Sequence, residues 1–97
     1  MNDTLDSLRS QLDAIDAQLL ECLRARLACC VEIGRWKKSQ GIAMMQPARI
    51  GVVKERAALF GARHGISEIF LHRLYDLIIA ETCRLETEVI DGAADAA

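Results

Sequence analysis

The N-terminal part of the chain carries apolar side chains at alternating steps of three and four residues, the spacing of one face of an α-helix. The row consists of Leu5, Leu8, Leu12, Ile15, Leu19, Cys22, Arg26, Cys29, Ile33 and Trp36. Asp3 or Thr4 can cap the start of this helix, and Gly41 stops it after about Ser39. A helix of about 35 residues is roughly 50 Å long. Two short helices in a 97-residue chain cannot cover its stripe, so the pattern indicates a second copy of the chain or another partner.

Two shorter helices are predicted after a loop that begins at Gly41. Pro47 suits the first turn of the second helix, because its missing N–H costs no hydrogen bond there, and Gly65 suits its C-terminal end. Ser67 caps the third helix, which continues to about Ile90. The inward faces carry Val52, Val53, Leu59 and Phe60 and then Leu71, Leu74, Ile78, Thr82, Leu85 and Val89. The expected fold class is therefore all-α, with one long and two shorter helices.

Composition and charge narrow the function classes. The chain is 52% hydrophobic and 27% charged, so it should fold as one domain, expected over residues 1–90 with a disordered tail over residues 91–97. A net charge of −2 argues against a nucleic-acid binder. No apolar run reaches membrane length, and we expect a soluble cytoplasmic protein. Four cysteines without a CxxC pair, and two distant histidines, favour free thiols and no metal site.

Arg26 is the only permanent cation in the apolar row of the first helix. Burying a guanidinium costs several kcal/mol unless an anion is buried with it. Arg26 can instead reach water or pair with Glu21 or Glu32. Lys37 follows eleven residues later, about 20° away on a helical wheel, and therefore shares its face. Two cations about 16 Å apart on one face can reach toward a small anion between them.

A second group of polar residues lies on the other two helices. Arg49, at the start of the second helix, adds a third cation. Thr82 and Glu86 are four residues apart, beside the apolar stripe of the third helix. A carboxyl that is partly buried there has a raised pKa and can remain a proton donor near neutral pH. The alternative is a carboxylate that forms an ion pair with Arg84 or with another exposed cation.

Arg9 precedes Arg26 by seventeen residues, which places the two roughly 25 Å apart on one rigid helix. One chain cannot bring both to the same small ligand. Two antiparallel copies can, because Arg9 of one copy then lies near Arg26 of the other. The spacing therefore predicts a site shared by two chains.

The segments LRSQLDAIDAQLLECLRARL, VEIGRWK, PARIGVVKERA and LYDLIIAETCRLE resemble the all-helical chorismate mutase family in their order, spacing and charge. The resemblance extends from about Leu5 to Val89. It implies an intertwined homodimer of three-helix chains with two shared sites. It also implies a [3,3]-sigmatropic rearrangement of a small dicarboxylate, chorismate to prephenate, that uses no metal or cofactor.

The resemblance also implies roles for individual residues. Arg26, Arg49 and Arg9 of the partner subunit match the positions that hold the two carboxylates, with Thr82 assisting. The positions that donate to the ether oxygen as its C–O bond breaks are matched by Lys37 and Glu86. Many family members carry glutamine at the latter position, and a glutamate there must be protonated in order to donate.

Two further departures concern the substituent on ring carbon 4. Gln46 and Ile50 stand where typical chorismate mutases have carboxylates near the 4-hydroxyl. The segment MMQPARIG instead resembles relatives that rearrange 4-amino-4-deoxychorismate to 4-amino-4-deoxyprephenate, which supply p-aminophenylalanine units for specialised metabolites. We therefore rank an aminodeoxychorismate mutase first and a chorismate mutase close behind. Isochorismate pyruvate lyases, which also tolerate apolar residues here, rank third.

A different class of protein is a catalytically silent helical dimer, such as a regulatory or scaffolding module. It predicts that the charged residues point in different directions and pair with their neighbours. The enzyme interpretation predicts that Arg26, Lys37, Arg49 and Glu86 converge on one pocket.

Overall fold

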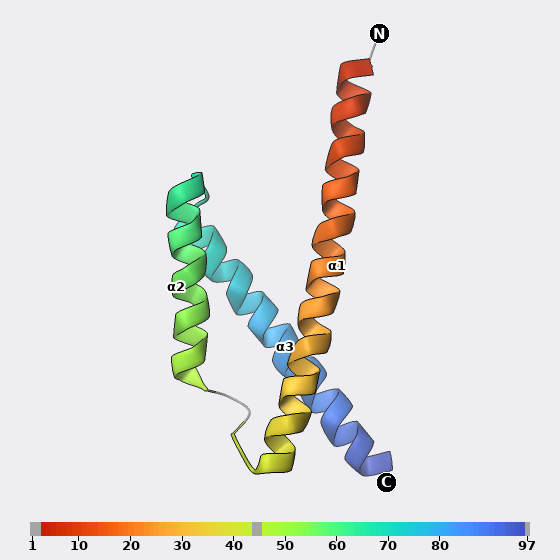
Figure 1. Ribbon diagram of the computed structural model, residues 1–97, viewed down its shortest axis with the longest axis vertical. Helices are drawn as coiled ribbons and strands as arrows, with labels where there is room; N and C mark the ends of the chain where they lie inside the picture. Colours follow the sequence, from red (N-terminus) through yellow and green to blue (C-terminus); the bar gives the residue numbers. More distant parts are fainter. Residues whose placement is uncertain (1–2, 44–45, 97) are drawn as a thin grey trace.

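The computed structural model describes residues 3–43 and 46–96, with side chains up to residue 89, and folds into three α-helices (Figure 1). Helix α1 spans Asp3–Gln40, α2 spans Pro47–His64 and α3 spans Glu68–Ala96. No strand forms in these ranges. The all-α fold with one long N-terminal helix is confirmed.

Local sequence explains where the helices begin and end. Pro47 lies in the first turn of α2, and Gly65 ends that helix with a left-handed φ of 70°, which only glycine adopts without strain. The N–H of Ile66 donates to the carbonyl of Gly61 at 2.9 Å and satisfies the last turn. The Ser67 hydroxyl accepts the N–H of Phe70 at 3.2 Å, as expected for the residue that caps α3.

Helix α3 packs against both other helices, whereas the backbones of α1 and α2 do not approach each other in the described part of the chain (Figure 1). Lys54 of α2 and Asp76 of α3 form an ion pair across one of these contacts. The apolar side chains that are buried are few, namely Val31, Ala57 and Leu71, one from each helix. This small core fixes the position of α3 between the other two helices.

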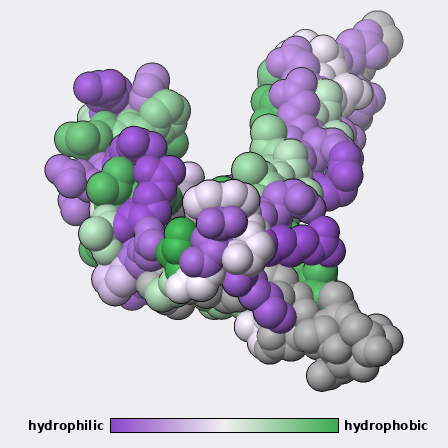
Figure 2. Space-filling view, turned by 60° about the horizontal axis from the view of Figure 1, so that its bottom comes forward, coloured by the Kyte–Doolittle hydropathy of each residue, from purple (hydrophilic) through white to green (hydrophobic). Residues whose placement is uncertain are grey.

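The N-terminal arm of α1, residues 3–22, projects away from the other helices (Figure 1). Every residue of the arm is exposed, and its apolar row from Leu5 to Leu19 is 45–58% exposed. The radius of gyration is 17.5 Å, against about 13 Å for a compact domain of 100 residues. Figure 2 shows hydrophobic side chains along the edge of this arm that faces the space beside α2. The chain itself therefore leaves the stripe uncovered.

The C-terminal end of α3 is longer than expected from the sequence, since its backbone continues to Ala96 rather than to about Ile90. The disordered tail expected over residues 91–97 lies outside the residues whose side chains are described. In the described ranges, no helix has a stretch long and apolar enough to cross a membrane.

Candidate active site

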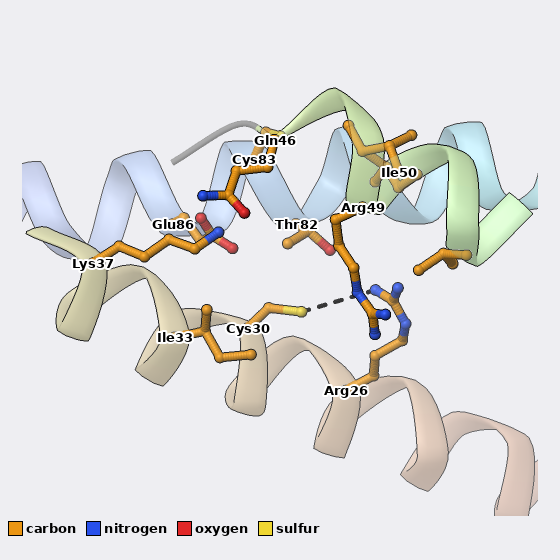
Figure 3. A pocket seen from close by; sticks show the side chains of 12 residues that line it. Arg26, Cys30, Ile33, Lys37, Gln46, Arg49, Ile50, Thr82, Cys83 and Glu86 are labelled. Carbon is orange, nitrogen blue, oxygen red and sulfur yellow. Dashed lines mark hydrogen bonds between the residues drawn. The ribbon is translucent and has the colours of Figure 1, made fainter. Parts of the chain in front are cut away.

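A pocket of about 380 Å³ lies where the C-terminal half of α1, the start of α2 and the middle of α3 come together (Figure 3). Its walls consist of Arg26, Cys30, Ile33, Lys37, Gln46, Arg49, Ile50, Val53, Ile79, Thr82, Cys83 and Glu86. Pockets that hold small metabolites begin at about this volume. Seven of the eight residues singled out in the sequence therefore border one space, and the eighth, Arg9, does not.

The α1 wall is made by residues spaced four, three and four apart, from Arg26 to Lys37. This spacing keeps all of them on one face of the helix, which is why the two cations look into the same pocket. Cys30 and Ile33 lie between them and were not singled out as site residues. Cys30 and Ile33 could have been identified from the sequence, because steps of four, three and four residues from Arg26 to Lys37 pass through both.

Two guanidinium groups come close at one end of the pocket, from Arg26 of α1 and Arg49 of α2 (Figure 3). Neither forms an ion pair with a described residue. Arg26 donates to the sulfur of Cys30 at 3.9 Å, and its guanidinium carbon lies 5.7 Å from the centre of the Tyr75 ring. Two neighbouring cations without a carboxylate repel each other, so this end of the pocket favours an anion.

The structure shows neither alternative considered for Arg26, which were extension into water and an ion pair with Glu21 or Glu32. Glu21 pairs with Arg24 at 2.8 Å, and Glu32 pairs with Arg35 at 2.9 Å. Both carboxylates are thus used on the exposed face of α1. Arg26 is half-buried rather than extended into water.

Glu86 lies at the other end of the pocket and is only 8% exposed. Burial raises the pKa of its carboxyl, and the nearby ammonium group of Lys37 opposes this shift in part. Figure 3 shows these two side chains extending toward each other from α3 and α1. Arg84 pairs instead with Glu81 and Glu88, each at 2.6 Å, so the surface ion pair considered for Glu86 does not form.

Three other side chains complete the polar part of the pocket. The hydroxyl of Thr82 donates to the carbonyl of Ile78 at 2.8 Å, which leaves its lone pairs directed elsewhere. Burial raises the pKa of the Cys30 thiol, and the Arg26 guanidinium opposes this shift. Gln46 precedes α2 and contributes a neutral amide. The pocket therefore offers cations for carboxylates at one end and an ammonium and a protonatable carboxyl at the other.

The missing member of the predicted set, Arg9, is exposed on the arm of α1. Seventeen residues of straight helix separate it from Arg26, roughly 25 Å. It therefore cannot reach the pocket of its own chain. Its assignment to the pocket of a partner remains a prediction.

Residues 8–87 match the chorismate mutase type II family. Because this match covers most of the chain, the chain belongs to that family, and the expectation of a chorismate mutase-type isomerase is confirmed.

Two curated relatives are similar over nearly the whole chain. A protein of Streptomyces pristinaespiralis named 4-amino-4-deoxychorismate mutase is 53% identical over 88 residues, which are 91% of this chain and 68% of the relative. A protein of Streptomyces venezuelae with the same name is 49% identical over 86 residues, which are 89% of this chain and 84% of the relative. No solved structure matches the chain significantly.

Proposed function

We propose that this protein rearranges 4-amino-4-deoxychorismate to 4-amino-4-deoxyprephenate. Family membership supports the reaction type, and the two relatives of that name, each about half identical, support the substrate. The observation that carries the proposal is the pocket itself. It separates an anion-binding end, Arg26 and Arg49, from a proton-donating end, Lys37 and Glu86.

The reaction takes place within one molecule: a C–O bond to the ether oxygen breaks while a new C–C bond forms, and no group is gained or lost. The protein therefore has to hold a flexible dicarboxylate in its compact reactive shape and to stabilise the charge that develops on oxygen. Arg26 and Arg49 bind the carboxylates from one side. Thr82 assists when its hydroxyl turns from the carbonyl of Ile78 and donates to a carboxylate. Arg9 of the partner subunit closes the site from the other side.

Lys37 and a protonated Glu86 donate to the ether oxygen. Charge accumulates on that oxygen as its bond to carbon lengthens, so both donors bind the transition state more strongly than the substrate. The burial of Glu86 supports this role, because it favours the protonated form that is able to donate.

Recognition of the ring substituent belongs to Gln46 and Ile50, which line the pocket from the start of α2. A neutral amide and an alkyl group replace two charges there. The oxygen of the Gln46 amide accepts from an amine, and Ile50 excludes water beside it. Met44 and Met45 of the MMQPAR segment lie outside the described residues.

The functional unit of the proposal is a homodimer in which each arm of α1 lies against the other chain. The uncovered apolar row of the arm and the distance of Arg9 from its own pocket support this assembly. A single catalytic domain over residues 1–90 and a cytoplasmic location complete the proposal. The four cysteines, none of which forms a disulfide, support a reducing compartment.

Comparing three substrates tests the proposed reaction. Purified protein is given 4-amino-4-deoxychorismate, chorismate and isochorismate, and kcat/KM and products are measured for each. The proposal expects the highest kcat/KM for the amino compound, with 4-amino-4-deoxyprephenate as the product. A higher value for chorismate would make the protein a chorismate mutase, salicylate from isochorismate would make it a lyase, and no turnover would leave a silent helical module.

Mixing two inactive variants tests whether the site is shared. Arg9→Ala and Arg49→Ala each damage both sites of their own homodimer. In a mixed dimer, one site combines Arg49 of the Arg9→Ala chain with Arg9 of the Arg49→Ala chain and is therefore intact. The other site lacks both arginines. Random exchange makes about half of the dimers mixed, so activity should return to about a quarter of wild type per chain. A mixture no more active than its components would show that each chain works alone.

A further inference from the structure

A second cavity, of about 350 Å³, adjoins the anion-binding end of the pocket. It shares Arg26 and Arg49 with the pocket, and Arg56 adds a third guanidinium beside the rings of Phe60 and Tyr75. Among the residues whose side chains the structure describes, no carboxylate lines this cavity. Arg56 is exposed and forms no ion pair with a described residue. Three cations so close together favour an anion. In the proposed function the substrate carboxylates occupy the first pocket, so they do not supply the anion for this cavity.

The arm of α1 carries the opposite charge. It has Asp3, Asp6, Asp13, Asp16 and Glu21 against the single cation Arg9, a net charge of −4. At 100° per residue, Asp16 lies about 20° from Arg9 and about 60° from the middle of the apolar row. Asp13 lies about 120° from the middle of that row and so points away from whatever covers it. Asp16 is thus the acid that borders the same surface as Arg9.

The register of the two helices brings this acid to the second cavity. Arg49 and Arg56 are seven residues apart on α2, and Arg9 and Asp16 are seven residues apart on α1. Each pair spans two turns, about 10 Å, on one face of its helix. Helix α2 runs antiparallel to α1 (Figure 1), so the α1 of an antiparallel partner runs parallel to α2. Placing the partner's Arg9 opposite Arg49 therefore places the partner's Asp16 opposite Arg56.

We propose that Asp16 of the partner subunit enters the second cavity and pairs with Arg56, and that this pair positions the partner's Arg9 at the substrate. The proposal rests on the shared site of the proposed function and adds two positioning residues to it. The carboxylate of Asp16 reduces the repulsion between the cations at this place. Without it, the partner's Arg9 approaches Arg26, Arg49 and Arg56 with no fixed anion among them. The pair also fixes the axial position of the partner's α1 along α2. The apolar row alone does not fix this position, because its apolar residues recur at every turn.

Reversing the charges tests the pair. Asp16→Arg and Arg56→Asp should each lower kcat/KM at least about tenfold, mainly through a higher KM, because a displaced Arg9 binds the carboxylate poorly. The double variant, in which the charges are exchanged, should recover to within about threefold of wild type, since it restores attraction at the same place. Arg56→Lys keeps the charge and should retain most of the activity. A purely structural role for either residue would not produce recovery on exchange.

Asp13→Arg is the matched control, because it places the same charge three residues earlier but away from the covered face. It should leave KM within about twofold of wild type. The proposal is overturned if the exchanged double variant is as poor as the worse single variant, or if Asp13→Arg is as harmful as Asp16→Arg. Wild-type turnover and the Arg9→Ala and Arg49→Ala mixture report on the proposed function separately, so its failure is distinguishable from failure of the pair.

Discussion

Among single residues, Glu86 is the group whose protonation most directly affects the proposed chemistry. Its carboxyl is buried near Lys37, and burial raises its pKa. In the proposed mechanism the protonated form donates to the ether oxygen, whereas the ionised form offers only lone pairs. A single proton therefore decides whether this end of the pocket stabilises the transition state.

Activity should fall as pH rises through the raised pKa of Glu86. The sign follows from the role: below that pKa the carboxyl is protonated and donates, and above it the donor is lost. Glu86→Gln donates at every pH, so its profile of kcat/KM should be flat where that of wild type declines. Profiles from about pH 5 to 8 for both proteins measure the difference. A flat wild-type profile would contradict the role of Glu86.

The same residue links stability to pH. An unfolded glutamate has a pKa of about 4.3, so between that value and the raised native pKa the folded state holds a proton that the unfolded state has released. Stability contributed by Glu86 is therefore full at low pH and is lost as pH rises. Glu86→Gln should raise the melting temperature relative to wild type at pH 8 and change it little at pH 4. An equal effect at both pH values would indicate that the carboxyl does not titrate differently on folding.

Cys30 should react more slowly with thiol reagents than Cys22 or Cys29. Burial raises the pKa of its thiol, so less of the reactive thiolate is present, whereas the other two side chains are exposed. Alkylation with iodoacetamide, followed residue by residue by mass spectrometry, measures the rates. Bound substrate should slow Cys30 further, since this thiol lines the pocket and contacts Arg26. Protection of Cys22 and Cys29 as strong as that of Cys30 would place the ligand elsewhere.

The residues of the pocket were predictable where one helix carries them. The shared face of Arg26 and Lys37 follows from a spacing of eleven residues, and the proximity of Thr82 and Glu86 follows from a spacing of four. The proximity of Arg49 to Arg26 could not be predicted in this way. The two residues lie on different helices, and the loop between α1 and α2 determines how these helices are placed. Cys83 and Ile79 were missed because an apolar face looks the same whether it meets another helix or a pocket.

At the scale of the elements, the turn between α2 and α3 packs closely against Gly61 of α2. A Cβ atom placed on Gly61 would lie 2.6 Å from the carbonyl oxygen of Ile66 and 2.7 Å from a methyl group of Leu71. The first of these contacts is with a backbone atom, which cannot move away by a change of side-chain rotamer. Glycine at this position therefore allows α3 to return close against α2.

Gly61→Ala should destabilise the protein by about 1–3 kcal/mol from overpacking, more than the gain of up to about 1 kcal/mol in helix propensity. Gly51→Ala is the matched control, because no atom lies within 4 Å of a Cβ there and the substitution only favours the helix. Chemical denaturation of both variants measures the difference. A Gly61→Ala protein as stable as Gly51→Ala would mean that the turn relaxes without cost.

The two ends of α2 and the start of α3 were the most predictable part of the fold, unlike the C-terminal end of α3. Pro47, Gly65 and Ser67 mark the ends of α2 and the start of α3 through local chemistry that needs no tertiary contact. The packing order was not predictable, because the apolar faces of α2 and α3 do not specify which of them meets α1. The structure shows that α3 contacts both.

At the scale of the whole molecule, the arm of α1 is a helix that its own chain does not stabilise. Its apolar row is about half exposed over about four turns, and isolated helices are marginal in water. In the proposed homodimer, burial of this row against the second chain supplies the missing stabilisation, at roughly 25 cal/mol for each Å² of apolar surface covered. Folding and assembly are then coupled.

The melting temperature should therefore rise with protein concentration, as mass action requires when the folded state is a dimer. Leu12→Asp places a charge in the apolar row and should abolish the dimer and much of the helical signal. Ser10→Asp adds the same charge on the opposite face and should leave both unchanged. Sedimentation and circular dichroism measure the two properties. A stable, helical Leu12→Asp monomer would contradict the coupling.

Helix α3 is the common neighbour of α1 and α2, whose backbones do not approach each other over the described residues. The width of the pocket, measured from the arginine on α1 to the arginine on α2, is therefore set by how α3 seats against each of them. Substitutions at such seating positions, for example Leu71 beside Gly61, change this width without replacing any side chain that lines the pocket. Laboratory evolution toward substrates of another size should accordingly collect changes along the packed faces of α3, at a distance from the reacting atoms.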